Sequence, residues 1–77
     1  MSYNGWKNQQ TWNVNLWLSN SEPLYRLVMN YGKEMTYRDF AEQYLVNFAS
    51  DKTPDGVSWL DDELDYPALD EVLEEMG

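Results

Sequence analysis

The stretch Thr11-Trp12-Asn13-Val14-Asn15-Leu16-Trp17-Leu18 decides the fold of this chain. At the helical period of about 100° per residue, its apolar side chains cover most of the circumference and are interrupted only by two asparagines. A helix that is apolar nearly all round belongs inside a domain, with other elements packed on two sides. We therefore predict a central helix over residues 9–19, N-capped by Asn8, with both tryptophans and Leu16 in the core.

The same stretch also alternates apolar and polar residues, as a β-strand would. Asn13 and Asn15 are poor strand formers, and Trp17 would fall on the wrong face of a strand, so a helix is preferred. Neither helix propensity nor core packing accounts for the two asparagines. We expect their side chains to hydrogen-bond backbone groups in the N-terminal lead-in or in the loop at residues 51–58.

Two further helices are predicted from their apolar stripes and caps. One is expected to follow the N-cap Ser21 and to end at Gly32, and its apolar residues recur at i, i+3, i+4 and i+7. The other begins at a pair that resembles a capping box, Thr36 and Asp39, and reaches about Ala49. Its inward residues are expected to be Tyr37, Phe40, Ala41, Tyr44, Leu45 and Phe48.

The C-terminal third combines a loop with a last helix. Val57, Trp59 and Leu60 are expected to dock on the core as an irregular clip near residues 51–60, and Asp65 is predicted to cap the last helix. The inward stripe of that helix is Leu69, Val72, Leu73 and Met76. The expected fold class is all-α, a compact bundle of about four short helices in which residues 1–77 form a single small acidic globular domain.

The net charge of −9 lies entirely in the last third of the chain. Residues 1–50 hold four acids and four bases, whereas residues 51–77 hold ten acids and one base, Lys52. Direct nucleic-acid binding is disfavoured, because phosphates are neutralised by clustered Lys and Arg. Without a signal peptide, an apolar run long enough to span a membrane, or any cysteine, the chain is expected to be soluble and intracellular.

The composition also argues against catalysis. The chain has no His and no Cys, which removes the commonest general base, the thiol nucleophile and the nitrogen and sulfur ligands of metals. It has no Gly-rich phosphate loop, and a carboxylate pair would need a sheltered cleft to separate its two pKa values. We therefore expect neither an enzyme nor a bound cofactor.

One segment, Asp51 to Asp62, partly matches the twelve-residue calcium-binding loop. Acidic or hydroxyl residues fall at positions 1, 3, 5 and 12, and a glycine falls at position 6. However, position 12 carries an aspartate where the loop needs a longer bidentate glutamate, and position 9 is Trp59. A Pro-Asp-Gly turn beside an acidic patch is the preferred interpretation, and no metal site is predicted.

Residues 61–75 are the most promising candidate for a binding surface, because they hold eight carboxylates and no base. Asp70 with Glu74, and Glu71 with Glu75, are i,i+4 like-charge pairs, which destabilise a helix by about 0.2–0.5 kcal/mol each. The last two glutamates also lie at the negative end of the helix dipole. The predicted partner-binding residues are Asp61, Asp62, Glu63, Asp65, Asp70, Glu71, Glu74 and Glu75, with Trp59 beside them. The alternative is an ordinary solvated face.

Trp6 and Trp59 admit two interpretations. Each is flanked by charged residues and can be an exposed anchor for a partner, because tryptophan is favoured in interaction hot spots. Core packing is the preferred interpretation of both.

Two segments resemble a family of small phage-encoded proteins. The first runs from Tyr3 to Leu18, where an Asn-Gly-Trp lead-in (residues 4–6) is followed by Thr-Trp-Asn-Val (11–14) and Leu-Trp (16–17). The second is Thr-Pro-Asp-Gly-Val (53–57), with Trp59 and the acidic last helix after it. The resemblance implies a phage origin, and hence the cytoplasm of an infected host cell, but assigns no functional residue. Small acidic phage proteins often inhibit host enzymes, some of them by mimicking DNA.

The resulting prediction is an interaction protein that inhibits or redirects a host protein with a basic surface. A defence nuclease of a restriction or CRISPR system is one such target, because a dense row of carboxylates approaches the charge density of a nucleic-acid backbone. The alternative is a structural or accessory phage protein that acts through an aromatic surface and has no inhibitory role. The sequence leaves the oligomeric state open.

Overall fold

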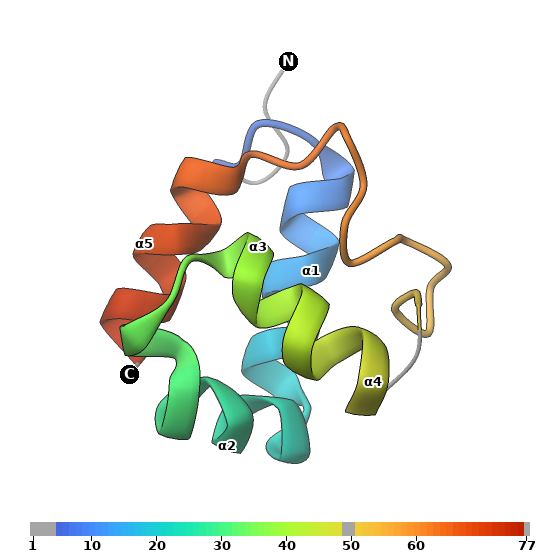
Figure 1. Ribbon diagram of the computed structural model, residues 1–77. Coiled ribbons are helices and arrows are strands. Elements are labelled where there is room, and N and C mark those ends of the chain that lie inside the picture. The colour runs from blue at the N-terminus through green and yellow to red at the C-terminus, as the bar shows by residue number, and fades with distance from the viewer. Residues whose placement is uncertain (1–4, 49–50, 77) are drawn as a thin grey trace.

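The computed structural model describes residues 5–48 and 51–76, which fold into helices joined by short connections and one long loop (Figure 1). Three of the helices are α1 (Gln9–Asn20), α2 (Glu22–Tyr31) and α5 (Tyr66–Met76). A fourth is continuous through α3 (Tyr37–Phe40), the π-helical turn η2 (Ala41–Leu45) and α4 (Val46–Phe48). A 3₁₀ turn, η1 (Gly32–Glu34), follows α2. The predicted all-α bundle of about four helices is confirmed.

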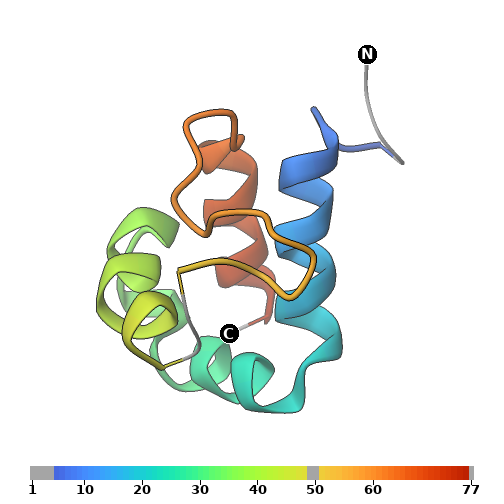
Figure 2. The same cartoon turned by 90° about the vertical axis from the view of Figure 1, so that its right-hand side faces the viewer.

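The first and last helices, α1 and α5, run side by side in the same direction (Figures 1 and 2). The α2 helix crosses below their C-terminal ends, and the α3–η2–α4 helix lies across the bundle from α1. Residues 51–65 pass over the side that remains open between α1 and α4 (Figure 2). The buried core draws on all of these elements: Val14, Leu18, Leu24, Val28, Tyr37, Phe40, Ala41, Leu45, Trp59, Leu64, Leu69, Val72 and Leu73.

The predicted helix caps are largely confirmed. The Asn8 side chain accepts a hydrogen bond from the backbone N–H of Thr11 at 2.9 Å, and the Thr36 hydroxyl accepts one from the N–H of Asp39 at 3.3 Å. Ser21 occupies the N-cap position of α2, but its side chain makes no capping hydrogen bond. Helix boundaries therefore follow local sequence signals closely.

The face of α1 that turns inward differs from the prediction. Its buried residues are Thr11, Asn13, Val14 and Leu18, whereas both tryptophans and Leu16 are only half-buried. Because the helix is apolar nearly all round, hydrophobicity alone does not determine which face is buried. The buried face is the one whose polar residues find hydrogen-bond partners. Thr11 and Asn13 find those partners in the loop at residues 51–65.

Gly32 follows the end of α2 as predicted, but it acts by close packing. Its φ of −64° is an ordinary helical value, and the chain continues directly into η1. The residue is buried, and an added Cβ would lie 3.1 Å from Cγ1 of Val28 and 3.5 Å from the Leu73 side chain. The glycine thus allows α2 and α5 to approach closely.

The remaining core predictions are mostly confirmed. Of the inward residues expected between 37 and 48, Tyr37, Phe40, Ala41 and Leu45 are buried. Tyr44 is half-buried and stacks on Tyr31, with ring centroids 4.5 Å apart and planes 8° from parallel. The Phe48 side chain and Ala49 lie outside what the structure describes. The clip is confirmed, because Trp59 is fully buried while Val57 and Leu60 pack against the core.

Candidate functional site

The eight carboxylates at residues 61–75 divide into two groups, and the first group shapes the backbone. Oδ1 of Asp61 accepts a hydrogen bond from the N–H of Glu63 at 2.7 Å, which closes a turn within the loop. Oδ1 of Asp65 accepts one from the N–H of Ala68 at 3.3 Å and so caps α5, as predicted. Both aspartates are half-buried, and their carboxylates stabilise the backbone of the loop and the start of α5.

Asp70 has a tertiary role that the helical pattern did not indicate. Its Oδ1 accepts a hydrogen bond of 2.7 Å from the backbone N–H of Tyr37. Tyr37 is the first residue of α3, where N–H groups have no partner within the helix, and the carboxylate also lies at the positive end of that helix's dipole. Asp70 therefore ties α5 to α3, and its predicted role in partner binding stays a prediction.

The second group consists of five exposed carboxylates: Asp62, Glu63, Glu71, Glu74 and Glu75. We call these five residues the acidic surface. The last three lie on α5 and include an i,i+4 pair whose Cβ atoms are about 5–6 Å apart. Among the described residues, no hydrogen bond or ion pair compensates these three side chains. The like-charge repulsion predicted from the sequence therefore still destabilises this part of α5.

Two lysines from other elements border the acidic surface. Lys7 and Trp6 line a hollow of about 260 Å³ together with Glu75 and other residues of α5. Lys33 lines a second hollow, of about 400 Å³, and Glu71 borders both. The bases thus lie at the two edges of the acidic surface, which the count of charges in residues 61–75 could not show.

Trp59 is not an exposed anchor. Its side chain is 0% exposed, and its backbone carbonyl accepts a hydrogen bond of 2.7 Å from the Tyr37 hydroxyl. Burial raises the pKa of that hydroxyl far above its ordinary value, with a smaller contribution from Tyr66. The assignment of Trp59 to partner binding is therefore wrong, and core packing is correct. Trp6 is half-buried beside α5.

Side-chain hydrogen bonds join α1 to residues 53–57, which belong to the two segments that carry the family resemblance. Nδ2 of Asn13 donates to Oδ2 of Asp55 at 2.7 Å, and the Thr53 hydroxyl donates to Oδ1 of Asn13 at 2.7 Å. Nε1 of Trp17 donates to the same Asp55 oxygen at 3.0 Å. The predicted loop is correct, but the partners are side chains rather than backbone. The bond predicted for Asn15 is not found within the described residues, where this side chain is half-buried.

A second set of bonds holds the approach to α5. Nδ2 of Asn8 donates to the backbone carbonyl of Glu63 at 2.6 Å. The Thr11 hydroxyl donates to Oδ1 of Asn8 at 2.7 Å and accepts a bond of 3.0 Å from the N–H of Asp65. Asn8 and Thr11 therefore position the loop that carries Asp62 and Glu63 and leads into α5, which carries the other three members of the acidic surface.

The segment that partly matches a calcium loop is organised by these bonds. One carboxylate oxygen of Asp55 accepts two hydrogen bonds from α1, and the pKa of Asp55 is lowered mainly by the bond from Asn13 and then by the bond from Trp17. In residues 5–48 and 51–76, no group of three or more carboxylates is arranged to hold a metal ion. The predicted turn is present, and the N–H of Gly56 donates to the carbonyl of Thr53 at 2.8 Å.

The fold and the surface define a small helical domain in which ten of the fourteen acidic residues lie on one helix and the loop before it. Within the described part of the chain, no helix is both long and apolar enough to cross a membrane. The chain belongs to DUF7249, a family of unknown function whose model matches residues 1–77. No curated protein and no solved structure matches it significantly.

Proposed function

We propose that the protein binds a basic, nucleic-acid-binding surface of a host protein in the cytoplasm of a phage-infected cell and inhibits or redirects that protein. The observation that supports this proposal most is the acidic surface: five exposed carboxylates on α5 and the loop before it, three of them kept on the helix at a cost in stability. The phage context rests on the resemblance of residues 3–18 and 53–57 to a family of small phage-encoded proteins. The proposed role is binding, not catalysis.

The spacing of the charges suits mimicry of a nucleic acid. Glu71, Glu74 and Glu75 lie within a helical rise of about 6 Å, given a rise of about 1.5 Å per residue. Double-stranded DNA carries one charge per roughly 1.7 Å, so the local densities are of the same order. A restriction or CRISPR nuclease has the kind of basic groove that such a surface fits.

The frame around the surface supports rapid and specific binding. Asp70 fixes α5 to α3, and Asn8 fixes the loop carbonyl of Glu63 to the start of α1. A backbone that is held in place before binding loses less conformational entropy when a partner docks. Complementary potentials of this kind mainly raise the association rate and make binding sensitive to salt.

The proposal is tested by reversing Glu71, Glu74 and Glu75 to Lys and capturing proteins from a bacterial host lysate at low and high salt. We expect wild-type protein to retain a partner at low salt and release it at about 0.5 M salt, where the Debye length falls to a few ångströms. The triple variant should retain none.

A matched control reverses three exposed acids away from the acidic surface: Asp39, Glu42 and Asp51. It changes the net charge by the same amount and should leave capture intact. Capture that survives the first triple reversal, or that high salt does not weaken, would contradict the proposal. Once the partner is known, added duplex DNA should compete with the protein if the acidic surface occupies its DNA groove.

The alternative, a structural or accessory phage protein acting through an aromatic surface, has one observation in its favour. Two tyrosines of α2, Tyr25 and Tyr31, are 38% and 40% exposed. This alternative predicts that Tyr25→Ser abolishes association with virion or host components, whereas reversal of the three α5 glutamates leaves it unchanged.

A further inference from the structure

Every large hydrophobic side chain that is exposed among the described residues lies on α2. These side chains are Tyr25, Met29 and Tyr31, at 38%, 53% and 40% exposure. Tyr31 stacks on Tyr44 and so belongs to the side of the bundle. Tyr25 and Met29 point away from the buried pair, Leu24 and Val28, and lie on the outward face of the helix.

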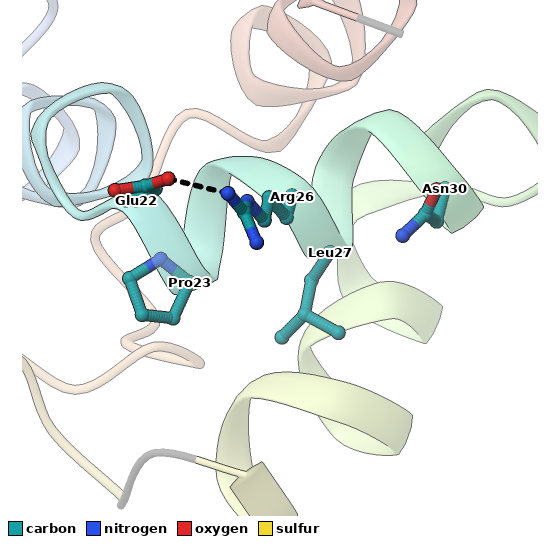
Figure 3. A pocket seen from close by; sticks show the side chains of 5 residues that line it. All are labelled: Glu22, Pro23, Arg26, Leu27 and Asn30. Atoms are coloured by element: carbon teal, nitrogen blue, oxygen red, sulfur yellow. Dashed lines mark hydrogen bonds and ion pairs between the residues drawn. The ribbon is translucent and has the colours of Figure 1, made fainter.

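The same outward face carries an ion pair. Nη2 of Arg26 lies 2.6 Å from Oε1 of Glu22, and these two side chains are 72% and 73% exposed. Together with Pro23, Leu27 and Asn30, they line a hollow of about 490 Å³ along α2 (Figure 3). In Figure 3, Pro23 and Leu27 extend from the same side of the helix, next to the ion pair. The hollow therefore has an apolar part and a charged edge.

The charge of this face contrasts with the rest of the protein. The chain has a net charge of −9, whereas α2 carries one acid and one base and is neutral. Glu22, Tyr25, Arg26 and Met29 follow one another at i, i+3, i+4 and i+7, so they form a single stripe. Glu22 and Arg26 lie one turn apart, so each of them can face the opposite charge of a second copy that lies antiparallel.

We propose that a second copy of this chain occupies this face, so that two α2 helices pack antiparallel about a two-fold axis. In a two-fold contact the same patch serves both molecules. An axis passing at the level of residue 24 brings Glu22 of each copy opposite Arg26 of the other, so that two ion pairs form across the contact.

The dimer is independent of the function proposed above, because α2 contributes none of the five residues of the acidic surface. A contact made by one ten-residue helix buries less than about 1,000 Å², so the dimer is weak. Two copies of charge −9 repel one another, and added salt screens that repulsion. Salt therefore strengthens or preserves the dimer, whereas it weakens binding through the acidic surface.

The decisive experiment is a charge swap followed by sedimentation equilibrium from about 10 μM to about 1 mM, a range suited to weak contacts. We expect wild-type protein to approach a dimer mass at the upper end. Arg26→Glu and Glu22→Arg each place like charges across the axis, and each alone should dimerise at least about tenfold more weakly. An equimolar mixture of the two variants should regain the wild-type dimer, because the opposite charges then face each other.

Lys7→Glu is the matched control, since it makes the same change in net charge as Arg26→Glu at an exposed residue outside α2. It should dimerise like wild type. Circular dichroism of each variant checks that the helices remain. Amide chemical shifts that change with concentration should lie on α2, with Glu22, Tyr25 and Arg26 affected most.

Wild-type protein that remains monomeric up to about 1 mM at high salt would overturn the proposal, and the face would then be covered by a different protein or by solvent. Dimers that form equally well in both single variants would overturn it too. Neither result bears on capture of a host protein by the acidic surface, so the two proposals fail separately.

Discussion

Asn13 and Asp55 are joined across 42 residues of chain by a hydrogen bond of 2.7 Å from the amide Nδ2 to the carboxylate Oδ2. Asn13 is 3% exposed, and its Oδ1 also accepts the hydroxyl of Thr53. The backbone N–H of Thr53 in turn donates to the carbonyl of Val57, which closes the turn before Trp59. One buried amide on α1 thus sets where the loop lies, and the loop places the largest side chain of the core.

The two asparagines of α1 provide a matched pair for testing this arrangement. Asn13→Ala leaves the Thr53 hydroxyl and the Asp55 carboxylate without their shared partner, so we expect it to lower the free energy of unfolding by about 2–3 kcal/mol. Asn15→Ala should change it by less than about 0.5 kcal/mol. Urea denaturation followed by circular dichroism measures both. Equal effects at the two positions would contradict the assigned role of Asn13.

Asp55 should make stability depend on acidity. Its pKa is lowered below the ordinary 3.8 by the hydrogen bonds from Asn13 and Trp17. A carboxyl group whose pKa is lower in the folded state stabilises that state above its ordinary pKa, and the contribution disappears as the pH falls through the folded-state value. The difference in unfolding free energy between wild type and Asp55→Asn should therefore be constant above about pH 5 and shrink below it.

Two measurements check this expectation. Urea denaturation of both proteins at several pH values gives the difference directly, and the subtraction removes the shared effect of the other carboxylates. NMR titration of the Asp55 carboxyl should show a pKa that moves up toward its ordinary value in Asn13→Ala. A pKa that is the same in both proteins would show that the Asn13 bond does not hold Asp55 in its charged form.

Asp70 and Glu74 form a like-charge pair on α5 but should respond oppositely to truncation. Asp70→Ala removes the acceptor for the Tyr37 N–H, so we expect a loss of about 1–2 kcal/mol in the free energy of unfolding. Glu74→Ala relieves repulsion at the negative end of the helix, so it should be neutral or stabilise by a few tenths, roughly 0.3 kcal/mol. Thermal denaturation of both variants distinguishes a structural acid from a surface acid.

Gly32 should tolerate no large side chain. Even a Cβ there would lie 3.1 Å from Val28, which is fully buried and β-branched and therefore has little freedom to move. We expect Gly32→Leu to cost about 2 kcal/mol or more in urea denaturation, through overpacking between α2 and α5. Lys33→Leu, at the exposed neighbouring position, should stay within about 0.5 kcal/mol. If Gly32→Leu proves as stable as wild type, α5 can move away from α2 at little cost.

Local signals in the sequence predicted the helices well. Asn8, Thr36 and Asp65 each cap a helix by bonding the backbone three positions further on, and a signal of that range is readable from the chain alone. The π-helical turn at Ala41–Leu45 was not predicted, because no cap or glycine marks it.

Tertiary relationships were less predictable. Trp12 and Trp17 are the bulkiest residues of α1, yet the helix buries Thr11 and Asn13, whose partners lie some fifty and forty residues away. Asp70 looked like part of an outer acidic face because only the position of α3 shows that it meets the N–H of Tyr37. Which acids of the predicted segment lie exposed depends on contacts between distant parts of the chain, and the sequence alone does not show those contacts.

The bonds between α1 and residues 53–65 also determine when the protein can fold during its synthesis. Asn13 leaves the ribosome long before Thr53 and Asp55, the residues 40 and 42 positions later that satisfy its amide. Until then the polar groups on the inner face of α1 stay hydrated, because burying them without hydrogen-bond partners costs free energy. The inner face of α1 is therefore completed only once the loop has been made, and a nascent chain that stops short of the loop presents an unfinished domain to chaperones and proteases.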